Sequence, residues 1–331
     1  MKTSRHIVAS AILFVTLAAY SQPALAQVSL SIGNLGSTSF EDGVVGPGGA
    51  FEQYVGYYSA GQSRDTSGNK VAGTNTLATT VPVSHLVWEF SKLRFLGANY
   101  GVETLIPFAD VGLNTPQTGN NRVHGLGDIV VSPLMLDWGP KKIAGRMYFS
   151  HATFDIDLPV GKYSDKRLLN PGSNAVGLNP WYSFTFYPVK NSTKWEVSSR
   201  LHYLWNSTNN SPFVGYGFKS MQAGQAFNVN YDGSYQVRKG FRLGFNGYAL
   251  QQLTDHKING RNLPNSRERV FGSGPGAEFG GQGLWFFANL YFESGAQNYT
   301  QGTRVMLRML KTFGGPPHEQ APAPPPQHPG V

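Results

Sequence analysis

The chain has 331 residues, of which only 14% are charged and 13% are aromatic, with 40 glycines and no cysteine. This composition and the lack of any long helical period argue against a soluble helical enzyme, and the missing cysteines argue against a small disulfide-stapled module. The formal net charge of +8 is dispersed among acids, so we expect no nucleic-acid partner, whereas a surface of anionic lipid headgroups fits.

The first element in the chain has the pattern of a secretory signal peptide, over residues 1–26. Lys2 and Arg5 precede an apolar run at 7–19, and the small-residue site Ala-Leu-Ala occupies 24–26. The apolar run is shorter than the ~20 residues that a membrane-spanning helix needs. We therefore expect the mature chain to leave the cytoplasm.

Beyond residue 50 the chain consists of runs in which apolar and polar side chains alternate. In one run Trp195 and Val197 share a face, while Glu196 and Ser198 share the other. Strands of soluble proteins average ~5–6 residues, and these runs are about twice as long, as for the ~9–11 residues of a tilted membrane-spanning strand. Twelve runs are predicted: 51–60, 81–91, 95–108, 125–138, 143–158, 176–189, 193–206, 223–237, 241–253, 270–280, 284–294 and 303–313.

The links between these runs alternate in length. We predict short turns at 91–94, at 139–142, around residue 191, at 238–240 and at 280–283. We predict long polar loops at 61–75, 110–125, 159–174, 207–222 and 254–269. Short turns on one side and long loops on the other are typical of bacterial outer-membrane barrels, whose turns lie in the periplasm. The sequence therefore predicts an all-β protein, a transmembrane antiparallel β-barrel of about 12 strands over residues 51–313, in the bacterial outer membrane.

The last predicted strand ends on Phe313, and a proline-rich stretch follows at 314–331. A barrel in a bilayer must pair its last strand with its first, because unpaired backbone groups there cost several kcal/mol. We expect 303–313 to be the closing strand and 314–331 to be a periplasmic tail, since proline cannot donate to a sheet. Phe313 resembles the C-terminal aromatic signal that the outer-membrane assembly machinery reads, so we expect that machinery as a partner.

Several stretches resemble one family, named for the MetA pathway of phenol degradation, of outer-membrane transport proteins. They occur in the expected order at 48–71, 125–138, 157–163, 170–188, 248–261 and 272–279. The resemblance implies a barrel associated with the catabolism of aromatic compounds. The Gly-rich segment 27–50, which precedes the first strand, either enters the barrel as a plug or stays in the periplasm.

The polar face of each run is predicted to point into the lumen. There it either orients a phenol-sized solute or forms mutually satisfied pairs; Trp285 and Tyr291, on the same face, indicate either an aromatic slide or simple packing. The predicted lumen-lining residues are His85, Glu89, Glu103, His151, Asp155, Asp157, Glu196, Arg200, His202, Asp232, Arg242, Trp285, Tyr291, Glu293, Arg304 and Arg308.

No catalytic constellation is evident. The chain has no G-x-S-x-G motif, and His85, His151 and His202 lie on strands without an obvious serine partner. Metal-ligand spacing is absent too, so we expect no enzyme, no cofactor and no metal. The favoured function is a channel for passive uptake of small aromatic or hydrophobic compounds. The alternatives are a structural or surface-binding barrel without transport and, less favoured, an outer-membrane lipid-modifying enzyme.

Two long loops carry basic residues that are suited to the phosphates of lipopolysaccharide. These residues are Lys162, Lys166, Arg167, Lys257, Arg261, Arg267 and Arg269.

The loops and the tail should lie on opposite sides of the membrane, and the absence of native thiols makes a clean test possible. Ser164→Cys and Asn259→Cys should react with an impermeant maleimide on whole cells. Gln327→Cys should react only after the outer membrane is breached. Labelling of Gln327→Cys on intact cells would reverse the predicted topology.

Overall fold

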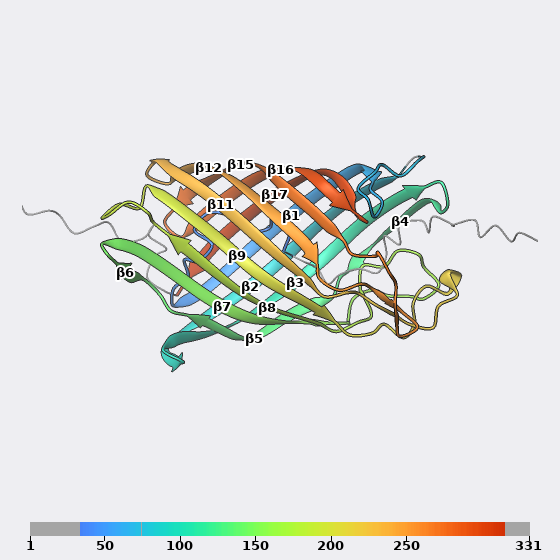
Figure 1. Ribbon diagram of the computed structural model, residues 1–331. Helices are drawn as coiled ribbons and strands as arrows, with labels where there is room; N and C mark the ends of the chain where they lie inside the picture. Colours follow the sequence, from blue (N-terminus) through green and yellow to red (C-terminus); the bar gives the residue numbers. More distant parts are fainter. Residues whose placement is uncertain (1–33, 74, 315–331) are drawn as a thin grey trace, which may run out of the picture.

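The computed structural model describes residues 34–73 and 75–314; the predicted signal peptide, residues 27–33 and all of the tail but Gly314 lie outside the described residues. The described chain is a closed antiparallel β-barrel of 12 strands (Figure 1). No helix in the described ranges is long and apolar enough to cross a membrane. The predicted fold class and strand number are confirmed.

Neighbouring strands of the barrel follow the order of the chain, and every pair is antiparallel. This order needs only local hairpin connections, which is what the alternating short and long links indicate. The barrel strands are β1 (Gly48–Ser63), β2 (Thr76–Phe95), β3 (Ala98–Thr115), β5 (Ile129–Asp137), β7 (Arg146–Leu158), β8 (Gly177–Phe186), β9 (Trp195–Asn206), β11 (Ala226–Arg238), β12 (Phe241–Gln252), β15 (Arg269–Gly281), β16 (Leu284–Gln297) and β17 (Thr300–Phe313).

Short elements extend the barrel at both ends. β4 (Gly119–Leu126) continues the line of β5 beyond a break at Gly127 and Asp128, and it pairs with β3. β6 (Lys141–Ile143) forms a small hairpin with β7. The loops at the opposite end contain the 3-10 helix η1 (Val214–Tyr216), β10 (Met221–Gln222), β13 (Lys257–Ile258) and β14 (Arg261–Asn262).

The first and last strands close the ring. β1 and β17 pair from Gly49 opposite Phe313 to Ser63 opposite Thr300, with one irregularity near the far end. The Phe313 ring lies on the outside, 6.3 Å from the ring of Trp88. The predicted closing strand therefore leaves neither terminal strand with a free edge over this length.

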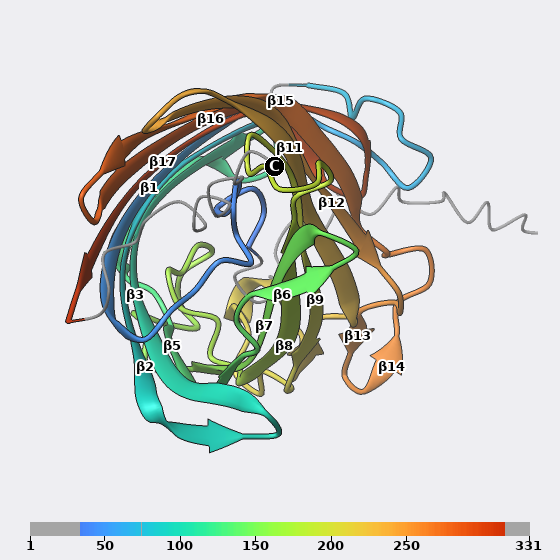
Figure 2. The same cartoon turned by 90° about the vertical axis from the view of Figure 1, so that its left-hand side faces the viewer.

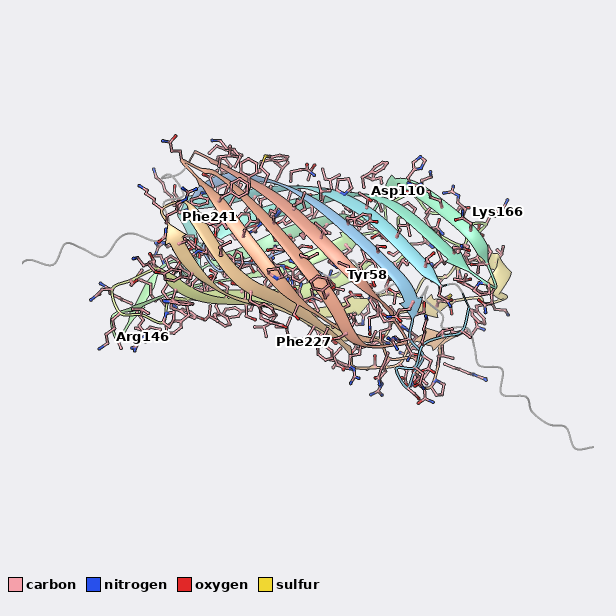
Figure 3. The ribbon with its side chains drawn as sticks, turned by 90° about the horizontal axis from the view of Figure 1, so that it is seen from above. Tyr58, Asp110, Arg146, Lys166, Phe227 and Phe241 are labelled. Atoms are coloured by element: carbon pink, nitrogen blue, oxygen red, sulfur yellow. The ribbon has the colours of Figure 1, made fainter. Side chains whose placement is uncertain are left out.

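Alternation along each strand separates an apolar exterior from a polar interior. On β9, Trp195 and Val197 are 51% and 46% exposed, whereas Glu196 and Ser198 are buried. The same alternation places Phe245 and Leu307 outside. Figure 3 shows the two ends of the barrel, with Arg146 and Phe241 towards the turns and Lys166 towards the long loops. The exterior suits hydrocarbon, and the interior needs polar partners.

Two predicted links are wrong in detail. Residues 91–94 belong to β2, and the turn lies at Leu96 and Gly97, whose φ angles of 50° and 75° suit a tight hairpin. Residues 110–125 are mostly strand, because β3 and β4 continue as a paired hairpin beyond the barrel wall. The polar, Gly-rich composition of 110–125 predicted a loop. A hairpin outside the bilayer needs no apolar side chains, so this composition is also compatible with paired strands.

Residues 34–47, which precede β1, lie inside the barrel. Figure 2 looks along the barrel from its turn end and shows this segment in blue within the ring of strands. Phe40 and Ser39 in this segment are each only 1% exposed. Of the two arrangements that the sequence left open, the described part of the segment has the internal one.

The outward assignment of Phe245 can be tested by stability. This residue is 56% exposed and lies ~13 Å along β12 from the turn, close to the middle of a ~25 Å apolar band. Phe245→Arg should lower the free energy of unfolding, measured by urea titration in lipid vesicles, by about 2–4 kcal/mol.

Phe245→Leu, which stays apolar, and Val214→Arg, in an exposed loop, are the controls and should cost far less. Equal losses for Phe245→Arg and Val214→Arg would contradict the assignment.

Candidate solute pathway

The predicted lumen-lining side chains all lie on the inner face of the barrel, and nearly all of them are buried. Most of them either bind the internal segment 34–47 or pair with other wall residues. Their position does not by itself establish a solute pathway, which depends on the cavities they border.

Asp42 is the strongest attachment of the internal segment. Its two carboxylate oxygens accept hydrogen bonds from Arg200 Nε and Nη2 at 2.7 and 2.8 Å, in a bidentate ion pair. Ser183 Oγ donates to the same carboxylate at 2.8 Å. The side chains of Arg200 and Asp42 are 12% and 4% exposed, so this pair is shielded from water. The guanidinium also lies 3.8 Å from the centroid of the Trp181 ring.

The neighbouring residues Glu41 and Phe40 make a second attachment. Glu41 Oε1 accepts hydrogen bonds from Arg242 Nη2 at 2.5 Å and from Tyr187 OH at 2.8 Å. Phe40 packs with Trp285 and Phe287. Phe40 and Glu41 have positive φ angles of 26° and 56°, which non-glycine residues adopt at a cost of order 1–3 kcal/mol. The attachment therefore holds a strained backbone.

The start of the described segment is fixed by amides. Asn230 donates from Nδ2 to Asn34 Oδ1 at 2.9 Å and accepts from the backbone N–H of Gly36 at 3.0 Å. Tyr291 OH donates to the carbonyl of Gly36 at 2.9 Å. Gly36 has a φ of 72°, and a Cβ there would lie 2.8 Å from the Tyr291 ring. Glycine is required at this point by both conformation and space.

A cluster of charged side chains lies on β1, β2, β3 and β17, across the barrel from Arg200. His85 Nε2 is 2.9 Å from Glu103 Oε2, and its Nδ1 is 3.5 Å from Glu52 Oε1. Glu52 also pairs with Arg308, whose Nη1 is 3.3 Å away. Arg308 reaches the internal segment as well, donating from Nη2 to the carbonyl of Ser39 at 3.2 Å. The two walls are therefore linked through Arg308.

The other carboxylates are held by hydroxyl, amide and indole donors. Glu293 accepts from Tyr58 OH and Tyr248 OH at 2.7 and 2.6 Å, and Arg304 Nε donates to the same Tyr248 oxygen at 3.3 Å. Further pairs have the same character: Asp155 accepts from Ser132 and Trp181, Asp157 from Asn179, Glu89 from Asn99, and Glu196 from Ser198 and Ser234.

His151 and His202 lie on either side of the Trp181 ring, at centroid distances of 4.8 and 5.7 Å. Both are buried, and neither ring nitrogen of His202 has a hydrogen-bond partner within the described residues. Asp232 is also buried on the same face. The described residues contain no cluster of three or more His, Cys, Asp or Glu side chains arranged to hold a metal.

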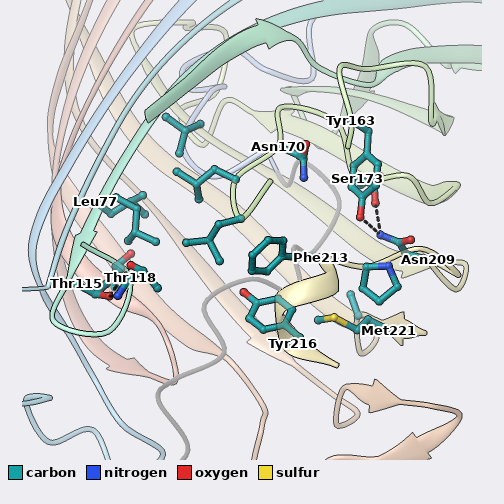
Figure 4. A pocket seen from close by; sticks show the side chains of 18 of the residues that line it. Leu77, Thr115, Thr118, Tyr163, Asn170, Ser173, Asn209, Phe213, Tyr216 and Met221 are labelled. Atoms are coloured by element: carbon teal, nitrogen blue, oxygen red, sulfur yellow. Dashed lines mark hydrogen bonds between the residues drawn. The ribbon is translucent and has the colours of Figure 1, made fainter. Parts of the chain in front are cut away.

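Two cavities lie inside the barrel, one towards each end, and residues 40–47 of the internal segment border only the inner one. The inner cavity, of about 230 Å³, is near the turn end and is bordered by ionisable side chains that include Glu52, His85, Glu103, Arg200 and Arg308. The outer cavity, of about 380 Å³, lies under the long loops (Figure 4). Among the residues that the structure describes, apolar side chains and neutral polar ones border it, and no charged one does.

The outer cavity owes its apolar wall to barrel strands and to loops that fold inwards. Leu77 and Leu113 come from β2 and β3, while Leu168, Phe213 and Tyr216 come from the loops. The rings of Phe213 and Tyr216 meet edge to face, with their centroids 5.3 Å apart. A cavity of this size, with aliphatic side chains from the barrel wall and aromatic ones from a loop, is suited to a small apolar solute.

Polar contacts fix those loops in place. Asn209 Nδ2 donates to Tyr163 OH at 2.8 Å and to the carbonyl of Ser173 at 3.2 Å. At the break between β4 and β5, Asp128 accepts from the backbone N–H groups of Gly161 and Ser173 at 3.0 and 2.7 Å. These hydrogen bonds hold the loop after β7 against the barrel wall, and this fixes the shape of the outer cavity.

Sequence reasoning left the position of the internal segment open, and it did not identify the residues that attach the segment or the inward folding of the loops. The signal for the first was Phe40-Glu41-Asp42, an aromatic residue and two acids inside an otherwise Gly- and Ser-rich stretch. The signal for the second was the presence of Leu168, Leu169 and Phe213 in loops that were predicted to be polar. Large apolar side chains in a long loop indicate that it packs against something.

The closed antiparallel barrel, with its apolar exterior and polar interior, defines a bacterial outer-membrane β-barrel protein. Residues 60–309 match the family described as MetA-pathway of phenol degradation, and the chain belongs to this family. The resemblance noted from the sequence is thus confirmed.

Solved structures show the same fold at low sequence identity. An outer-membrane channel from Pseudomonas putida F1 is similar with a TM-score of 0.73 and 17% identity, over 83% of this chain and 100% of that chain. The transport unit of the autotransporter AIDA-I from Escherichia coli is similar with a TM-score of 0.53 and 11% identity, over 84% of this chain and 93% of that chain. No curated protein matches the chain.

The Arg200–Asp42 pair should control how firmly the internal segment is held. Asp42→Asn leaves a buried guanidinium without its counter-ion, and removal of one partner from a buried pair costs about 3–5 kcal/mol. We expect Asp42→Asn to release the segment and to raise single-channel conductance in planar bilayers. Asp165→Asn, which removes the same charge from an outer loop, is the control. Identical conductance for the two folded variants would contradict this role.

Proposed function

We propose that this protein mediates the passive uptake of small, neutral aromatic and apolar solutes across the outer membrane. The observation that carries the proposal is the outer cavity. Its border includes Leu77, Leu113, Leu168, Phe213 and Tyr216, and within residues 34–73 and 75–314 no charged side chain borders it. The family description, which concerns phenol degradation, supports the same class of solute.

The outer cavity selects neutral apolar solutes over charged ones, because the two differ in the free energy of transfer from water into it. An apolar solute gains about 25 cal/mol for each Å² of apolar surface that it removes from water. A charged solute would lose its hydration there without a counter-ion, which costs far more than the apolar contacts return. A phenol hydroxyl would still find a partner, since Tyr163, Asn170 and Asn209 are among the neutral polar groups that border the cavity. Neutral aromatic compounds therefore fit best.

Passage onwards requires a path around or through the internal segment. The segment lies in the lumen, where Arg200, Arg242 and Arg308 hold it against the barrel wall. We propose that the segment acts as a plug that moves when a solute passes. The wall holds the plug through side chains such as those of Arg200, Arg242 and Arg308. The plug can therefore detach and return without breaking the backbone hydrogen bonds between the strands.

Two further partners belong to this proposal. Lys166, Arg167, Lys257 and Arg261 are exposed at the loop end, where they would bind the phosphates of lipopolysaccharide. Phe313 lies on the outside at the end of β17, where the residue is 44% exposed and available to the outer-membrane assembly machinery. A variant Phe313→Ala would test the second partner through the amount of folded protein recovered from outer membranes.

Uptake into proteoliposomes tests the proposed function directly. Labelled phenol and toluene should enter faster than into empty liposomes, and benzoate, which is charged at neutral pH, should not. Phe213→Glu places a carboxylate in the outer cavity and should lower the initial uptake rate at least about tenfold, because burying an unpaired charge costs more than the ~1.4 kcal/mol that a tenfold change represents.

Val214→Glu is the matched control, because Val214 is adjacent in η1, is 60% exposed and does not border the cavity. Its uptake should equal that of the unaltered protein. No solute entering faster than into empty liposomes would reject transport and favour a barrel with a structural or surface-binding role.

A further inference from the structure

The exposed charges at the turn end of the barrel are all of one sign. The β2–β3 hairpin presents Lys92 and Arg94, and its tip projects away from the wall (Figure 2). The next turn presents Lys141 and Lys142 on β6. All four side chains are exposed.

The same pattern continues around the circumference. Lys190 and Lys194 flank the β8–β9 turn, Arg238 and Lys239 lie at the β11–β12 turn, and Lys311 lies near the end of β17. All five are exposed, and only the β15–β16 turn, around Gln282, lacks a cation. We name the nine exposed cations of these five sites the basic rim.

No carboxylate offsets the basic rim. Within residues 34–73 and 75–314 no aspartate or glutamate is exposed, and the acids nearest this end, Glu89, Asp137, Glu196 and Glu278, are buried on the inner face. The loop end differs, because half-buried acids accompany its cations, as in the 2.6 Å contact between Arg122 and Asp110. The turn end therefore carries an unneutralised positive charge on its exterior.

Large apolar side chains lie between the cations. Leu93 and Leu96 in the β2–β3 hairpin are 51% and 71% exposed, Ile143 follows Lys142, and Trp195 follows Lys194. Lys and Arg beside aromatic and aliphatic groups are typical of the boundary between headgroups and acyl chains, where the cation reaches the phosphate and the apolar group remains in hydrocarbon.

We propose that the basic rim binds the headgroups of anionic phospholipids in the periplasmic leaflet of the outer membrane. The geometry favours this partner over a soluble one, because cations at five sites around the ring can all be met at once only by a layer that surrounds the barrel. An acidic protein would contact one arc of the ring and leave exposed apolar groups elsewhere uncovered. The proposal depends on the outer-membrane orientation of the turns and is independent of what the lumen transports.

Lipid-dependent quenching of tryptophan fluorescence tests the proposal on the intact protein. The barrel is placed in phosphatidylcholine vesicles that contain increasing amounts of brominated phosphatidylglycerol, and Trp195, beside Lys194, reports nearby bromine. We expect phosphatidylglycerol to be preferred over brominated phosphatidylcholine, by about fivefold for each cation that meets a phosphate, and the preference to decrease at high salt.

Matched variants separate the two ends of the barrel. The rim variant carries Lys92→Gln and Lys239→Gln, and the loop variant carries Lys70→Gln and Lys219→Gln, two lysines for which we propose no lipid contact. All four lysines are exposed, so both variants should fold, which circular dichroism and heat-modifiable gel mobility verify. The rim variant should lower the preference for phosphatidylglycerol by about 25-fold, at about fivefold for each cation, and the loop variant should keep it.

Two outcomes would overturn the proposal. One is equal lipid preference in the rim variant, the loop variant and the unaltered protein. The other is that the unaltered protein binds purified peptidoglycan and the rim variant does not, while the two have the same lipid preference. That result would assign the basic rim to the cell wall.

Discussion

Backbone hydrogen bonding in a medium without water is the constraint on which this structure depends. Each N–H or C=O group left unpaired in the hydrocarbon costs several kcal/mol, so the pairing of β1 with β17 is as necessary as any hairpin. Closure fixes the two faces of every strand. The outward face must then be apolar, and the polar groups opposite must find their partners within the enclosed space.

The interior meets that requirement in two ways. Wall residues such as Glu293 and Asp155 are satisfied by tyrosine, serine and tryptophan donors fixed on the strands. Arg200 instead depends on the carboxylate that Asp42 of the internal segment brings to it, while Arg242 pairs both with Glu41 of the segment and with Glu278 of the wall. If the segment moves as we propose, the buried charge of Arg200 is costly while the segment is away, and this cost favours its return.

The fold followed from the sequence because membrane-spanning strands obey a strict period. The alternation around Trp195 and Val197 and the alternating lengths of the links define strands, faces and topology without any tertiary information. The attachment of Phe40, Glu41 and Asp42 could not be predicted, because a segment with no regular period binds through contacts with residues more than a hundred positions away. The outer cavity could not be predicted for the same reason, since Leu77 and Phe213 border one cavity only after the loops have folded.

The described border of the outer cavity carries no charge, and this has a consequence for the rate at which the proposed solutes would enter. Charged binding sites gain their association rates from long-range attraction, which dissolved ions weaken. A neutral solute approaching neutral walls has no such attraction to lose, so its encounter rate is set by diffusion and by the width of the opening. The proposed uptake of such compounds would therefore be equally fast in fresh and in saline water.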